Sequence, residues 1–157
     1  MKNPLAKFAF KLISVSMLVA VYANPAAAQL QPWEDYEASD SVLDVTYVDL
    51  DPGTMGIYLE GLKATWLAAN KVAKELGHIE DYSIYANQYG SGDAFDLVLV
   101  IKMASTADIA PNRERYNEFM AAWGEKNRDM SNEKVLELYN KIRRIQGNYL
   151  LREITVK

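Results

Sequence analysis

Cysteine is absent from the 157-residue chain, and histidine occurs only once. The absence of cysteine excludes disulfide bonds, catalysis by a thiolate and metal sites built from thiolates. A lone histidine argues against a zinc site made of several histidines and against a histidine-based catalytic triad. This residue, His78, directly follows the helix-stopping Gly77, where a polar side chain can bond the last helix carbonyls. The sequence therefore predicts no metal site and identifies no catalytic residue.

Long apolar runs are also scarce, and the one prominent run lies near the start of the chain. Residues 12–23 are mainly apolar; three lysines precede them and three alanines, at 26–28, follow them. A positively charged N-terminal region, a short apolar segment and small residues before a cleavage site are typical of an export signal. The run is about half of the roughly 20 residues that a membrane span needs. We therefore expect a signal peptide at residues 1–28, cleaved after Ala28, and a periplasmic or secreted mature protein without a membrane segment.

Positive charge is in short supply in the rest of the chain. Residues 29–157 hold 14 basic and 21 acidic side chains, which gives a formal charge of −7. An acidic protein repels phosphate backbones, so we expect neither nucleic acid nor an anionic membrane surface as a partner. Residues 29–41 carry four acids with Pro32 and Trp33, and are expected to form a flexible, solvated leader. The remaining residues, 42–157, are long enough for one domain.

Four segments have the composition of strands. In Val42–Leu50 apolar and polar residues alternate tolerably, and branched and aromatic residues are frequent. Residues 82–89 are expected to form a second strand. Residues 90–93 supply a glycine-rich hairpin turn, followed by the strongest strand, 94–103. Residues 149–156 are expected to form a closing strand.

Three helical segments alternate with these strands. The first begins after Thr54, an expected N-cap, and ends at Gly77. In this helix Gly56 and Gly61 suggest close packing, because each glycine lowers helix propensity. A second helix is expected to open at Pro111-Asn112, and Ser131 to cap a third that ends at Gly147, with Arg143 and Arg144 at its solvated end. The apolar stripe of the third helix is Val135, Leu138, Ile142 and Ile145.

The order of these elements predicts an α+β fold. Strand, helix, strand, strand, helix, helix, strand is the ferredoxin-like split βαβ arrangement with an extra helix and a four-stranded antiparallel sheet. The helices can cover only one face of that sheet, yet residues 97–101 are apolar on both faces. A second copy of the sheet would cover the other face, so we expect a homodimer. Side chains alternate between the two faces of a strand, so Leu97, Leu99 and Ile101 lie on one face and Val98 and Val100 on the other. The sequence does not say which of these two sets faces the helices.

Several segments together resemble a known group of proteins. Residues 47–53, the helix with Trp66, and residues 85–88 and 96–100 resemble dimeric α+β-barrel proteins near the NIPSNAP-like group, and more distantly antibiotic-biosynthesis-type monooxygenases. The resemblance covers residues 42–156. The wider superfamily includes cofactor-free monooxygenases, haem-degrading enzymes, haem peroxidases and proteins with no known reaction. The resemblance thus implies a dimer with a cavity; it requires no cofactor and leaves haem open.

The candidate binding residues are aromatic and amide side chains. Tyr85, Asn87 and Tyr89 lie on one face of the second strand, and Trp66 lies on the first helix. A line of Tyr and Asn facing a cavity could hold a small aromatic or apolar ligand through ring contacts and hydrogen bonds. Alternatively, the tyrosines pack between the sheets of the dimer and Trp66 belongs to the core.

These observations leave three functions. The first is an exported small-molecule-binding or otherwise unassigned dimeric barrel protein. The second is a cofactor-independent monooxygenase acting on an aromatic substrate in the barrel, and the third is a structural dimer without a ligand. The lack of an acid–base constellation favours the first.

Overall fold

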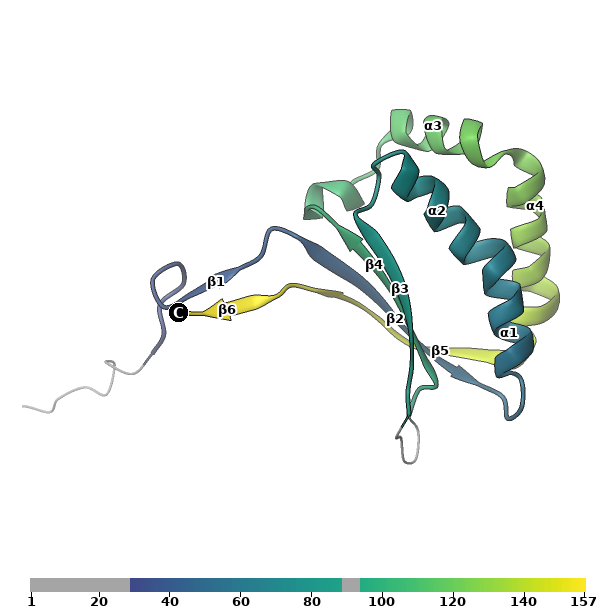
Figure 1. Cartoon of the computed structure of the whole chain (residues 1–157), viewed down its shortest axis with the longest axis horizontal. Coiled ribbons are helices and arrows are strands. Elements are labelled where there is room, and N and C mark those ends of the chain that lie inside the picture. Colours follow the sequence, from purple (N-terminus) through teal and green to yellow (C-terminus); the bar gives the residue numbers. More distant parts are fainter. Residues whose placement is uncertain (1–28, 89–93) are drawn as a thin grey trace, which may run out of the picture. The chain divides into compact units, whose positions relative to one another are not determined.

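The computed structural model describes residues 29–88 and 94–157, and the domain considered below is Gln31–Lys157 (Figure 1). The predicted signal peptide, the predicted turn at residues 90–93 and Tyr89 lie outside the described residues. Among the helices of the described ranges, none has the length and apolar character needed to cross a membrane.

A four-stranded antiparallel sheet forms one layer of the domain. Its strands are β2 (Val42–Leu50), β3 (Asp81–Ala86), β4 (Leu97–Met103) and β5 (Arg143–Leu151), in the order β3-β4-β2-β5. This order, with the first and third strands of the sheet side by side at its centre, is that of a ferredoxin-like fold. The predicted α+β class and four-stranded antiparallel sheet are confirmed.

The first helical run lies between β2 and β3. It consists of α1 (Met55–Leu62), a π turn (Lys63–Leu67) and α2 (Ala68–Glu75). Thr54 precedes α1, but its Oγ1 donates to the Asp51 carbonyl, so its side chain does not cap the helix. The run ends before Gly77, whose φ of +72° favours glycine.

The second helical region opens as predicted, because Asn112 caps α3 (Arg113–Trp123) by accepting a hydrogen bond from the Arg115 N–H, but it differs from the prediction further on. After a 3₁₀ turn (Thr106–Ile109), α3 and α4 (Glu125–Lys134) meet at Gly124, whose φ is +84°. The prediction that Ser131 caps a helix is wrong, because α4 begins at Glu125 and runs through Ser131. The glycine backbone at 124 makes the break instead. A π turn (Val135–Tyr139) and the short α5 (Asn140–Ile142) complete the region.

The start of β5 also corrects the prediction. The predicted third helix continued to Gly147, whereas β5 begins at Arg143 and pairs Arg143 with Leu50 and Ile145 with Val48. Pairing with β2 overrides the local helical pattern, since strand pairing depends on neighbours distant in sequence. Gln146 is an extra residue at a bulge between Ile145 and Gly147.

All of the helices in the described residues lie on one side of the sheet (Figure 1). The alternation of β4 turns Leu97 and Leu99 toward them, where they join Val48 and Leu50 in the core. Val98 and Val100 face the other side. The helix side of this core is completed by Tyr58, Leu62 and Tyr139.

A two-stranded ribbon extends β2 and β5 beyond the sheet (Figure 1). Its strands β1 (Tyr36–Ala38) and β6 (Ile154–Val156) are antiparallel, and the Lys157 N–H donates to the Asp35 carbonyl over 2.8 Å. The leader predicted at residues 29–41 therefore contains a strand. A strand of three residues, such as β1, is too short to show a recognisable alternation of apolar and polar residues.

Candidate functional site

A cavity of about 300 Å³ lies between the α1–α2 run and the α3–α4 region. This volume is at the lower end of the range for small-molecule sites. Most of the lining is apolar, with rings from four residues of both helical regions. These rings belong to Trp66, Phe119, Trp123 and Tyr139.

The two π turns place a pair of hydroxyl groups in the wall of this cavity. Thr65 lies in the first π turn and Tyr139 ends the second, and their oxygens are 2.8 Å apart. Thr65 Oγ1 also donates to the Gly61 carbonyl over 3.0 Å. Isolated π turns are frequent at functional sites, because they redirect side chains out of the regular helical stripe. Burial is the main cause that raises the pKa of Tyr139 from its ordinary 10.0.

Ser131, which lines the same cavity, carries an unusual polar atom. Its Oγ is buried and has no hydrogen-bond partner among the described residues. Leaving a buried hydroxyl unpaired costs about 1–3 kcal/mol, so such atoms are rare. The unpaired Oγ is the most informative polar group of the cavity.

Arg143 brings a positive charge to the cavity wall. Its Nη1 donates to the Tyr58 hydroxyl over 2.7 Å, and its guanidinium carbon is 4.9 Å from the centre of the Tyr139 ring. In the part of the chain that the structure describes, no carboxylate lies within ion-pair distance of this guanidinium. The prediction that Arg143 is a solvated helix end is wrong, because the side chain is half-buried at the start of β5.

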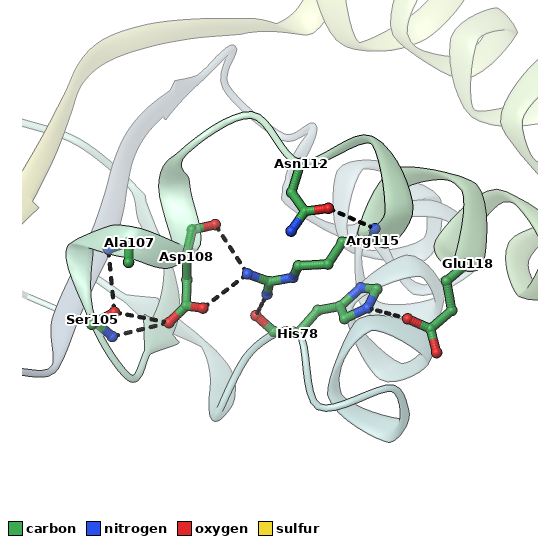
Figure 2. A network of polar contacts seen from close by, with 7 residues as sticks. All are labelled: His78, Ser105, Ala107, Asp108, Asn112, Arg115 and Glu118. Atoms are coloured by element: carbon green, nitrogen blue, oxygen red, sulfur yellow. Dashed lines mark hydrogen bonds and ion pairs between the residues drawn. The ribbon is translucent and has the colours of Figure 1, made fainter.

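His78 lies in a separate polar network that joins the end of α2 to α3 (Figure 2). Its Nε2 is 2.9 Å from Glu118 Oε2, and its carbonyl accepts a hydrogen bond from Arg115. Arg115 also pairs with Asp108 at 2.8 Å. The backbone N–H of His78, and not its ring, bonds a helix carbonyl, that of Ala73. Residues 29–88 and 94–157 contain no group of three or more His, Asp or Glu side chains that could hold a metal ion.

The predicted binding residues are spread over both sides of the sheet. Trp66 lines the cavity and meets the Tyr82 ring edge-on at 5.8 Å. Tyr85 pairs with Val98 and points to the opposite face, where it is 58% exposed. Asn87 lies beyond the end of β3, and its Nδ2 donates to the Phe95 carbonyl over 2.8 Å. The structure does not bring Tyr85 to Trp66, and the part of each residue in binding stays a prediction.

The sheet face opposite the helices, here called the open face, is largely apolar. Tyr47 packs edge-on against Phe95 at 4.6 Å and Tyr149 at 5.6 Å. With Gln146 and Leu151 these rings border a shallow cavity of about 460 Å³. The other apolar or aromatic side chains that the pairing places on this face are Leu43, Val45, Val98, Val100 and Tyr85.

Sequence reasoning found one cavity residue, Trp66, and missed the polar ones. Ser131 was assigned to a helix cap and Arg143 to a solvated surface. The spacing of Ser131, Val135 and Tyr139, each four residues apart, was the available signal, because such residues share one side of a helix.

Comparison with known proteins gives structural likeness only. No protein-family model and no curated protein matches the chain. A NIPSNAP family protein of unknown function from Agrobacterium tumefaciens is 17% identical, with a TM-score of 0.44 over 76% of this chain and 90% of that one. An uncharacterized NIPSNAP-like domain protein from Burkholderia xenovorans is 14% identical, with a TM-score of 0.43 over 75% and 85%.

A third similar structure is a dimeric protein of unknown function and ferredoxin-like fold from Bacteroides fragilis. It is 9% identical, with a TM-score of 0.39 over 76% of this chain and 99% of that one. The structural neighbours of this chain are thus NIPSNAP-like and dimeric ferredoxin-like proteins of unknown function, the groups that residues 42–156 resemble.

Proposed function

We propose that the protein binds a small apolar molecule in the cavity between its helices. The observation that carries this proposal is a cavity walled by aromatic rings whose lining includes Ser131, a residue with a buried and unpaired Oγ. A ligand that enters the cavity would bond this hydroxyl once the Ser131 side chain turns toward it, and would bury its own apolar surface against Trp66. Both gains favour binding, because an unpaired buried hydroxyl raises the free energy of the empty protein and because the transfer of the ligand's apolar surface out of water is favourable.

We further propose that two copies associate through the open face. Its exposed apolar side chains, Tyr85, Tyr149 and Leu151, would otherwise contact water, whereas a second copy would bury them in a two-fold interface. The charges at its border are already paired within the chain: Arg144 with Asp49 at 2.8 Å, and Lys74 with Asp81 at 2.8 Å. A second copy therefore meets no unpaired charge at these positions.

Export of the mature domain is the third part of the proposal. It rests on the lysine-led apolar run and the small residues before Gln29. N-terminal sequencing of the exported protein should give Gln29 as its first residue. Recovery of the full-length chain in the membrane fraction would contradict it.

Native mass spectrometry of protein purified from its original host tests the ligand. We expect a bound small molecule that is retained by the unaltered protein and lost on acid denaturation. Ala69 lines the cavity, so Ala69→Leu should fill part of it and reduce retention. Ala122→Leu adds the same side chain at an exposed position of α3 and is the matched control.

The outcomes separate the three functions. Retention that survives Ala69→Leu would place the ligand elsewhere, and no retention at all would favour the ligand-free structural dimer. Consumption of oxygen with chemical conversion of the retained compound would favour the monooxygenase.

A further inference from the structure

Arg143 and Arg144 are adjacent in sequence but differ in their partners. Arg144 pairs with Asp49 at 2.8 Å and with Asp51 at 3.1 Å. Arg143 points to the other side of the sheet, where its one polar contact with the described protein is the Tyr58 hydroxyl. A guanidinium has five N–H donors, so most of the donors of Arg143 are left to water or a ligand.

A half-buried cation without a counter-charge is costly. Removing a charge from water is favourable only when an opposite charge or several hydrogen bonds replace the water. The chain has 21 acidic side chains, yet none of the described ones reaches Arg143. Stacking on Tyr139 and Tyr58, at 4.9 and 5.6 Å, holds the guanidinium in place and leaves its edge free to pair.

The two unsatisfied polar groups belong to different parts of the cavity wall. Arg143 is beside Tyr139, and Ser131 is eight residues before Tyr139 on the same side of the second helical region. Eight residues of helix span about 12 Å. Val135 lies between them, and Trp66 and Trp123 line the same cavity.

We propose that the ligand is an apolar carboxylic acid that contains a ring. Its carboxylate pairs with Arg143, its ring lies among Trp66, Trp123 and Val135, and a polar substituent bonds Ser131 Oγ. The guanidinium suits a carboxylate because its two parallel N–H groups match the two oxygens. One unpaired cation matches one negative charge; the other arginine of the cavity, Arg128, already pairs with Asp129 at 2.8 Å. This inference rests on the proposed function.

Calorimetry with two matched probes tests the carboxylate. 1-Naphthaleneacetate and 1-naphthaleneacetamide have the same ring and nearly the same shape, but only the first is charged at neutral pH. We expect the acid to bind at least about tenfold more tightly, since hydrogen bonds to charged groups are the stronger ones. The ratio of the affinities of the unaltered protein for the two probes shows whether the cavity prefers a carboxylate, without the need for a variant.

Substitutions then locate the charge. Arg143→Met should lower acid binding to the level of the amide and leave amide binding unchanged, which also shows that the cavity is intact. Arg144→Met is the control, because its side chain lies on the open face and should not alter either affinity. Should Arg143→Met fail to fold, Arg143→Lys keeps the charge and should keep the preference for the acid.

Two results would overturn the inference in different ways. Equal affinity for both probes, or loss of acid preference in Arg144→Met alone, contradicts the carboxylate but leaves the cavity as a binding site. Saturable binding of neither probe, together with no retained compound in the host protein, contradicts the proposed function itself.

Discussion

Gly61 lies directly against the ring of Tyr139. A Cβ atom at position 61 would come within 2.7 Å of both Tyr139 Cε1 and its hydroxyl oxygen. The two residues belong to different helical regions, and the buried Thr65–Tyr139 hydroxyl pair lies beside this contact. The absence of a side chain at Gly61 therefore sets how closely α1 and the second π turn approach each other.

Substitution of this glycine should destabilise the protein. We expect Gly61→Ala to lower the free energy of unfolding by about 1–3 kcal/mol, because the added methyl group has to displace the Tyr139 ring. Gly56 lies in the same helix, and a Cβ there would meet nothing within 4 Å. Gly56→Ala should thus raise the free energy of unfolding by up to about 1 kcal/mol. Urea unfolding measures both; equal effects of the two substitutions would contradict the packing argument.

Removal of the Ser131 hydroxyl should stabilise the ligand-free protein. Ser131→Ala deletes an unpaired buried oxygen, so we expect the free energy of unfolding to rise by about 1 kcal/mol or more. Ser105→Ala is the contrasting control, since Ser105 Oγ accepts a hydrogen bond from the Ala107 N–H over 3.2 Å and its loss should destabilise. A destabilised Ser131→Ala protein would show that this hydroxyl has a structural partner.

The two faces of β4 should respond differently to charge. Leu99 is 5% exposed in the core, and an aspartate there leaves a buried charge unpaired, so Leu99→Asp should prevent folding. Val98 lies on the open face, and Val98→Asp should leave a folded single chain. Light scattering gives the mass and circular dichroism the fold. A mass of one chain for the unaltered protein at micromolar concentration would contradict the dimer.

The stability that the Asp49–Arg144 pair contributes should be lost as the pH falls below about 4. The hydrogen bond and charge of Arg144 lower the pKa of Asp49 from its ordinary 3.8, so the folded state favours the carboxylate. This contribution is complete above the ordinary pKa and is lost as the pH falls through the lowered one.

Urea unfolding at pH 6 and pH 3 tests this sign. Asp49→Asn should be less stable than the unaltered protein at pH 6, and the difference should shrink at pH 3. Asp44→Asn, at an exposed position of the same strand, is the control and should show little difference at either pH. A difference for Asp49→Asn that does not change with pH would contradict the argument.

Strong local patterns explain which parts of the fold were predictable. β2 was predicted with its observed bounds, and the first helix with its end near Gly77, because alternation, a helical stripe and a stop residue agree there. Close packing was rightly expected at Gly61 and wrongly at Gly56.

Other parts depend on contacts that the local sequence does not express. The helical stripe runs on to Ile145, and only pairing with β2 turns residues from Arg143 onward into a strand. The same limit applies to the cavity. Ser131 resembles any other helix-capping serine until the folded chain buries its Oγ. Arg143 resembles a surface arginine until its guanidinium lies over the rings of Tyr58 and Tyr139.

The strand order also determines when the chain can fold. β2 lies between β4 and β5 and pairs Leu43 with Leu151, so the central strand needs a neighbour that is synthesised long after it. Ribosomes add about 5–20 residues per second, whereas helices form within microseconds. Arrival of β5, and not the speed of helix formation, therefore sets the earliest moment of folding. For a chain that is exported, this delay favours crossing the membrane before the domain folds.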